Sequence, residues 1–159
     1  MIDYIDLIQK NQVSPPVNVI GLANQMGVKV WASKSLSIDV SGKLFKDANL
    51  AGESGYAILV NGTHPEVRQR FTIAHEIAHF MLHRKDVGEG IVENTFYRSS
   101  LSSAQEVEAN KWAAEILMPY RLIKSVRAEK NIEAHDAATL ARQFNVSEIA
   151  MKIRLGINY

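Results

Sequence analysis

Residues 71–83 read FTIAHEIAHFMLH, and the interpretation of the whole chain starts from this stretch. Residues 75–79 within it have the pattern H-E-x-x-H. On a helix, four residues separate two side chains by about 40° around the axis and about 6 Å along it, so His75 and His79 can bind one metal ion. Neutral imidazole suits zinc, which keeps a position open for water in catalytic sites. Glu76 lies about 100° around the helix from His75, where it can reach that water without binding the metal.

A five-residue pattern can also arise by chance, on a helix that carries two surface histidines and a solvated glutamate. The flanking residues favour the metal site, because an apolar stripe lies on the same side of the helix as the histidines. Five residues form this stripe: Val67, Phe71, Ala74, Ala78 and Leu82. The histidines therefore lie at the edge of a face that we expect to be buried.

A zinc peptidase site needs a third protein ligand. A third histidine six residues after His79 is absent, because position 85 is a lysine. His83 lies about 12 Å along the helix axis from His75, too far for one ion to contact both side chains. We therefore interpret His83 as a structural residue or as a hydrogen-bond partner of a ligand.

Residues 106–119, EVEANKWAAEILMP, offer a carboxylate from a following helix. Glu106 shares a small, apolar face with Asn110 and Ala113, which suits close packing against the first helix. Glu108 lies about 200° away and is expected to be an exposed charge. We therefore expect Glu106 to be the third ligand and Asn110 to hold a ligand histidine by its other ring nitrogen. The alternative for Glu106 is a first-turn carboxylate that serves the helix dipole.

The remaining patterns predict an α+β chain, because short strands precede a run of helices. A small, mostly antiparallel N-terminal sheet should pack on the H-E-x-x-H helix and on the second ligand helix, before a C-terminal bundle of short helices. We expect one domain over 1–159, with a catalytic core at 1–119 and a helical tail at 120–159. Helices are predicted at 1–12, 17–26, from a Thr63–Glu66 capping box to about 83, 102–118, 120–129, 134–143 and 148–156; strands at 28–31, 38–40, 43–45 and 56–60; and a polar loop at 84–101.

Composition excludes several classes of protein. The 159 residues contain no cysteine, which removes disulfide scaffolds, cysteine-bound zinc and thiol nucleophiles. The formal net charge of +1 argues against a strongly basic nucleic-acid binder. The N-terminus does not have the pattern of a signal peptide, and no apolar run is long enough for a membrane span, so we expect a cytoplasmic protein.

Residues 137–149 predict a helix, a tight turn at Asn145 and a second helix capped by Ser147. This arrangement is typical of a helix-turn-helix. The second helix, however, offers Ile149 and Met151 where a DNA-reading helix needs polar side chains. We expect a hairpin that packs on the core or docks a partner, and DNA contact through 134–156 stays as an alternative.

Taken together, these motifs resemble the ImmA/IrrE-type zinc metallopeptidases. The resemblance includes the FTIA lead-in to the motif, the motif itself, His83 and the A-N…L-M-P run within 109–119, and it extends weakly over the rest of the chain. It implies a minimal thermolysin-like fold with Zn²⁺ on His75, His79 and Glu106, and with Glu76 as catalytic base. Related zinc peptidases have aspartate where Asn110 stands, so the orienting hydrogen bond here is neutral.

The resemblance also implies a substrate class, a helix-turn-helix (Xre-type) repressor whose cleavage derepresses mobile-element, phage or stress genes. We therefore expect a zinc endopeptidase of narrow specificity, which the presence of Glu76 favours. Tyr97 and Arg98, in a loop that could cover the site, are candidates to stabilise the transition state, as are His64 and His83. The strand at 56–60 is a candidate edge for binding extended substrate. The alternatives are a metal-stabilised regulator or toxin–antitoxin component without catalysis, and a DNA-binding module.

Overall fold

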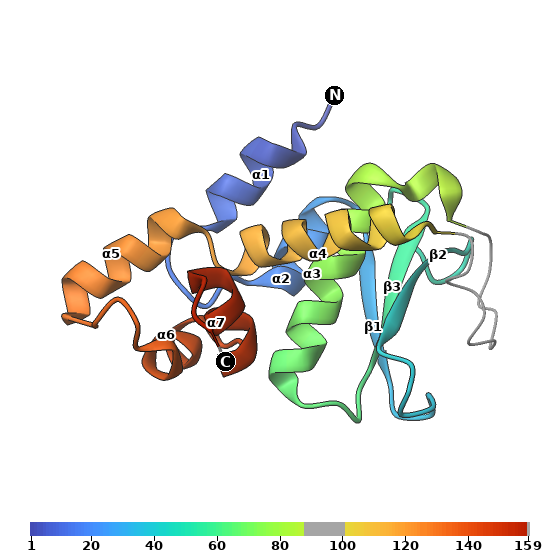
Figure 1. Cartoon of the computed structure of the whole chain (residues 1–159). Coiled ribbons are helices and arrows are strands. Elements are labelled where there is room, and N and C mark those ends of the chain that lie inside the picture. The colour runs from blue at the N-terminus through green and yellow to red at the C-terminus, as the bar shows by residue number, and fades with distance from the viewer. Residues whose placement is uncertain (88–100, 159) are drawn as a thin grey trace.

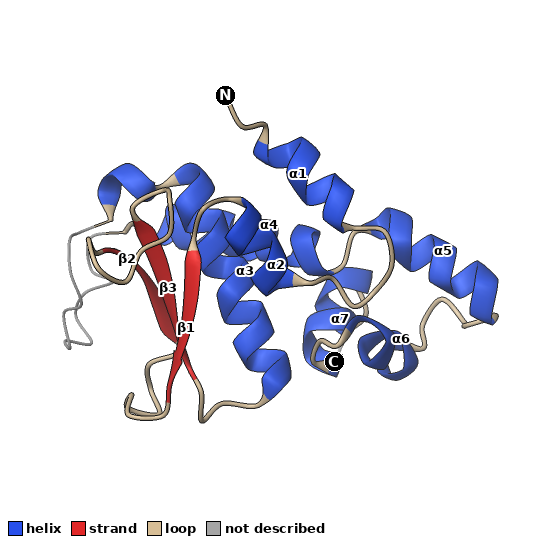
Figure 2. Cartoon of the chain, turned by 180° about the vertical axis from the view of Figure 1, so that it is seen from behind, coloured by secondary structure: helices blue, strands red, loops and turns tan. Residues whose placement is uncertain are grey.

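The computed structural model describes residues 1–87 and 101–158. Three strands lie together at one end of the molecule, and the last three helices gather at the other (Figures 1 and 2). The chain is α+β, as predicted. In order, the elements are α1 (Tyr4–Asn11), α2 (Val19–Gln25), β1 (Lys29–Ser33), β2 (Gly42–Lys46), β3 (Tyr56–Asn61), α3 (Glu66–Leu82), a 3₁₀ turn (Arg84–Asp86), α4 (Ser103–Leu117), α5 (Tyr120–Lys130), α6 (Ala137–Phe144) and α7 (Glu148–Leu155).

The sheet has the strand order β1-β3-β2 and is mixed. β3 runs parallel to β1 and antiparallel to β2, so the expectation of a mostly antiparallel sheet was only half right. Every residue of β3 is buried, and its central position means that it has no free edge for an added strand. The predicted strand at 38–40 is instead a turn, in which the Val40 N–H donates to the Ser37 carbonyl.

α3 is the central helix, and all its residues from Thr72 to Phe80 are buried. It packs against β2 and β3 on one side and against α2 and α4 on others. The predicted capping box at its start does not form, because Thr63 Oγ1 donates to Asn61 Oδ1 at 2.7 Å and Pro65 takes the N-cap position. Its burial along most of its length is what removes the motif side chains from bulk water.

α4 begins with a capping box in which Ser102 and Gln105 exchange hydrogen bonds. This box fixes the start of the helix where the sequence predicted it. Small side chains then line the face turned to the core, with Ala109 and Ala113 fully buried. Small residues allow close approach, so α4 can bring side chains from its first turns to the motif of α3.

The three tail helices form where predicted, although α6 begins at Ala137 rather than 134 because Asp136 caps it. Asn145 adopts the left-handed conformation expected for the turn between α6 and α7. The turn is tied to α3, since Arg70 Nε donates to the Asn145 carbonyl at 3.1 Å. Arg154 of α7 donates to the Met118 carbonyl at 2.8 Å. The hairpin therefore packs on the helices that carry the motif.

Candidate metal centre

His75 and His79 project from one face of α3, as their spacing requires. Their Nε2 atoms lie 3.0 Å apart, and the rings meet nearly edge to face with centroids 4.6 Å apart. Both residues are buried, with 6% and 1% of their surface exposed. Two ring nitrogens thus converge on one point inside the protein.

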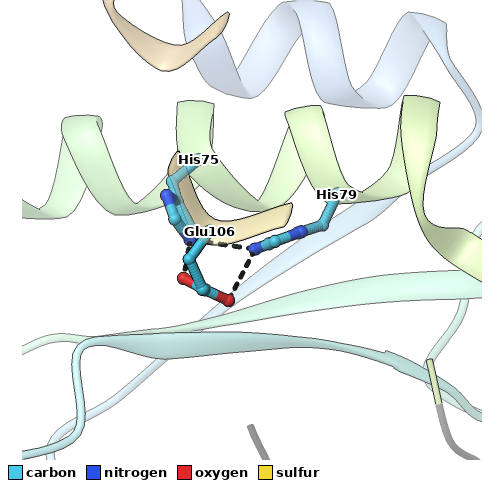
Figure 3. A group of neighbouring side chains, drawn as sticks. All are labelled: His75, His79 and Glu106. Atoms are coloured by element: carbon cyan, nitrogen blue, oxygen red, sulfur yellow. Dashed lines mark hydrogen bonds and ion pairs between the residues drawn. The ribbon is translucent and has the colours of Figure 1, made fainter. Parts of the chain in front are cut away.

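Glu106, in the first turn of α4, completes the group (Figure 3). Its Oε2 lies 3.1 Å from His75 Nε2, and its Oε1 lies 3.2 Å from His79 Nε2. One carboxylate therefore faces both rings. A carboxylate that only complemented the helix dipole would not need this orientation.

Asn110, one turn beyond Glu106, contacts the outer nitrogen of His75. Its Oδ1 lies 2.9 Å from His75 Nδ1. An amide oxygen only accepts hydrogen bonds, so Nδ1 is the donor and Nε2 of the neutral ring carries a lone pair. That lone pair points at Glu106 and His79.

The donor set fits a divalent cation. Three ligand atoms, one from each residue, lie within 4.8 Å of one another. Tetrahedral zinc with bonds of about 2.0–2.1 Å separates its ligand atoms by about 3.3 Å. The two Nε2 atoms lie 3.0 Å apart, and each has one Glu106 oxygen at 3.1 or 3.2 Å, so the separations are of this size. Glu106 Oε1 is also buried and, within the described part of the chain, makes no well-formed hydrogen bond. A cation among these atoms would give that oxygen a partner. It would also remove the repulsion between the lone pairs of the carboxylate and of the ring nitrogens, which lie close together.

Glu76 follows His75 directly on α3 and is only 3% exposed. It is not one of the three grouped residues, as its position on the helix predicts. A carboxylate in this position has little contact with bulk water. It can exchange a proton with a molecule at the metal without occupying a ligand position.

His83 does not join the group but contacts it from outside. Its Nδ1 lies 3.0 Å from His79 Nδ1, and its Nε2 lies 2.9 Å from Glu108 Oε2. Glu108 is 52% exposed, in line with expectation, but it is not merely a solvated charge. The sequence did not predict this contact, because Glu108 lies about 200° around α4 from Glu106 and was therefore expected to point away from α3. Measured from the buried Ala109, Glu106 lies about 60° to one side and Glu108 about 100° to the other, so both flank the packed face.

Of the three further candidates, the structure describes only His64. Tyr97 and Arg98 lie outside the described residues. His64 precedes α3, and His75 lies nine positions after the helix start at Glu66, about 14 Å along the axis. Its Nε2 lies 2.8 Å from the Ile38 carbonyl, so His64 holds the turn between β1 and β2.

The chain belongs to the peptidase family described as the IrrE N-terminal-like domain, whose sequence pattern residues 23–156 match. A relative is the radiation response metalloprotease IrrE of Deinococcus deserti, 34% identical over 92 residues, which are 58% of this chain and 33% of the relative. The matched residues therefore cover about a third of that protein.

A solved structure, a Mycobacterium tuberculosis transcriptional regulator, matches 97% of this chain and 45% of its own, with a TM-score of 0.64. At 16% identity, this likeness shows the fold alone. Within residues 1–87 and 101–158, no helix combines the length and apolar character that crossing a bilayer requires.

Proposed function

We propose that this chain is a zinc-dependent endopeptidase in which His75, His79 and Glu106 bind the metal and Glu76 is the catalytic base. The observation that carries this proposal is the convergence of three ligand atoms from two helices beside a buried glutamate. Membership of a peptidase family and similarity to a metalloprotease support it. The two imidazoles and one carboxylate form a ligand set that zinc uses in hydrolases.

Zinc in this position supplies Lewis-acid chemistry, polarising the scissile carbonyl and lowering the pKa of water. The chain's own contribution is proton transfer and orientation. Glu76 takes the proton from the attacking water as the new C–O bond forms, and delivers it to the amine as the C–N bond breaks. Asn110 holds His75 in the required tautomer. Tyr97 and Arg98 remain our candidates for stabilising the negative oxygen.

For the substrate, we propose a helix-turn-helix repressor cut at few positions in the cytoplasm, with derepression of mobile-element, phage or stress genes as the outcome. In this proposal residues 1–159 act as one domain, with 1–119 as the catalytic core. The tail at 120–159 serves protein contact rather than DNA contact. The exposed side chains of α7 support this division, since Ile149 and Ile153 are 60% and 58% exposed and cannot hydrogen-bond to bases.

A trapping experiment tests the proposal. Wild type and the Glu76→Gln variant are expressed in the source organism, recovered by affinity purification, and analysed by mass spectrometry for partners and new peptide termini. Metal content is measured on both, because Glu76→Gln should keep the metal and lose proton transfer. Glu129→Gln, an exposed glutamate on α5, is the matched control and should behave as wild type.

We expect a repressor that stays intact with Glu76→Gln and is cut with wild type, which would also give the cleavage site. A partner recovered intact and in equal amount with both proteins would overturn the peptidase proposal. It would favour a metal-stabilised regulator that acts by binding.

A further inference from the structure

A line of hydrogen bonds leads from the candidate ligand His79 to the surface. Nδ1 of His79 lies 3.0 Å from Nδ1 of His83, whose Nε2 lies 2.9 Å from Glu108 Oε2. The two rings are buried, with centroids 5.2 Å apart, whereas the Glu108 side chain is half exposed. The line therefore ends on a charge that α4 presents at the edge of the helix pair.

The carboxylate of Glu108 determines where the hydrogens lie along this line. An ionised carboxylate only accepts, so Nε2 of His83 must carry a hydrogen. In the neutral ring, Nδ1 of His83 is then the acceptor, and the hydrogen between the two rings belongs to Nδ1 of His79. Nε2 of His79 is consequently left with a lone pair, which faces Glu106 and His75.

We propose that Glu108 is a positioning residue of the metal site: through His83 it holds His79 in the tautomer that offers Nε2 to the metal. This inference rests on the proposed metal site. Glu108 does for His79, at one remove, what Asn110 does for His75 directly. The two histidines thus receive their orientation from the same helix that supplies Glu106.

The reverse tautomer shows what Glu108 prevents. If His83 carried its hydrogen on Nδ1, His79 would have to accept there and keep its own hydrogen on Nε2. A protonated Nε2 cannot bind a metal. Loss of such an outer partner typically lowers metal affinity by about 10–100-fold.

The test compares Glu108→Leu, which removes the acceptor, with Glu108→Gln, whose amide oxygen can still accept from His83. Glu129→Leu controls for replacing an exposed helical glutamate. The dissociation constant for Zn²⁺ is measured by competition with a chromophoric chelator. The tautomers of His79 and His83 in the metal-free protein are measured from ¹⁵N ring shifts. Thermal unfolding confirms that each variant is folded.

We expect Glu108→Leu to weaken Zn²⁺ binding about tenfold or more, Glu108→Gln to recover most of that loss, and Glu129→Leu to match wild type. Wild type should show hydrogen on Nε2 of His83 and Nδ1 of His79, and Glu108→Leu a mixture of tautomers. A folded Glu108→Leu that binds Zn²⁺ as tightly as wild type would overturn the inference and leave the proposed function standing.

The ¹⁵N measurement on wild type tests the inference even if Glu108→Leu does not fold. A hydrogen on Nδ1 of His83 in wild type would overturn it. If wild type itself bound no Zn²⁺, the proposed function would fail instead. The two failures are therefore distinguishable.

Discussion

The amide oxygen of Asn110 accepts a hydrogen bond from Nδ1 of His75 at 2.9 Å, across the contact between α4 and α3. This bond fixes both the ring orientation and the tautomer of His75. Glu106 lies one turn earlier on the same helix, and its carboxylate faces the other nitrogen of the ring. Orientation and ligation of one histidine therefore depend on how α4 lies against α3.

Asn110→Leu removes the acceptor from His75 and should weaken Zn²⁺ binding by about 10–100-fold. Asn110→Asp keeps an acceptor in place and adds a negative charge, so its affinity should equal or exceed that of wild type. Chelator competition measures all three dissociation constants. Equal affinity in Asn110→Leu and wild type would show that the contact does not orient the ligand.

Removal of the metal should lower the melting temperature of wild type, because a ligand that binds only the folded state adds stability. At a free concentration 100 times the dissociation constant, this contribution is about 2.7 kcal/mol. Glu106→Gln removes the charged ligand. In this variant the difference in melting temperature between Zn²⁺-loaded and chelator-treated samples should be much smaller than in wild type. Glu133→Gln, an exposed glutamate in the tail, should keep it. A metal-dependent shift of wild-type size in Glu106→Gln would exclude Glu106 as a ligand.

Local signals made most of the fold predictable. Helix periodicity and the capping box at Ser102 are formed by neighbours in sequence, so α3 and α4 were expected close to their observed bounds. The grouping of His75, His79 and Glu106 followed from helix geometry applied to these two elements. What helix geometry could not provide was the parallel pairing of β1 with β3, which depends on contacts distant in sequence.

Two misses came from competition between side chains. Thr63 had the pattern of a capping box, but Asn61 lies two residues away and takes its hydroxyl hydrogen. Glu108 had the pattern of a solvated charge, yet its long side chain reaches around the flank of α4 to His83. In both cases the residue type was compatible with two partners, and tertiary packing decided between them.

Gly42→Ala should destabilise the fold, because β2 lies too close to both β3 and α3 for a side chain at this position. A Cβ on Gly42 would collide with the Leu59 carbonyl oxygen and lie 2.7 Å from Thr72 Cγ2. Overpacking of this kind costs about 1–3 kcal/mol, measurable by denaturant unfolding. Gly62→Ala is the matched control, since its nearest neighbour would be 3.4 Å away, and it should change stability far less. Equal effects of the two substitutions would contradict this account of the packing.

Asp136 makes the stability of the tail depend on pH. Its Oδ1 accepts the backbone N–H of Thr139 at 3.0 Å as the N-cap of α6, and this hydrogen bond lowers the pKa of Asp136 below its ordinary value of 3.8. A carboxyl whose pKa is depressed by folding stabilises the protein above its unfolded-state pKa, and the contribution is lost as pH falls through the folded-state value.

Wild type should therefore exceed Asp136→Ala in unfolding free energy near neutral pH, with the gap narrowing as pH falls below about 4. Asp136→Asn keeps a capping oxygen that does not titrate, so its advantage over Asp136→Ala should stay nearly constant with pH. Urea unfolding across this pH range measures both gaps, and a constant gap between wild type and Asp136→Ala would show that the charge of Asp136 does not contribute.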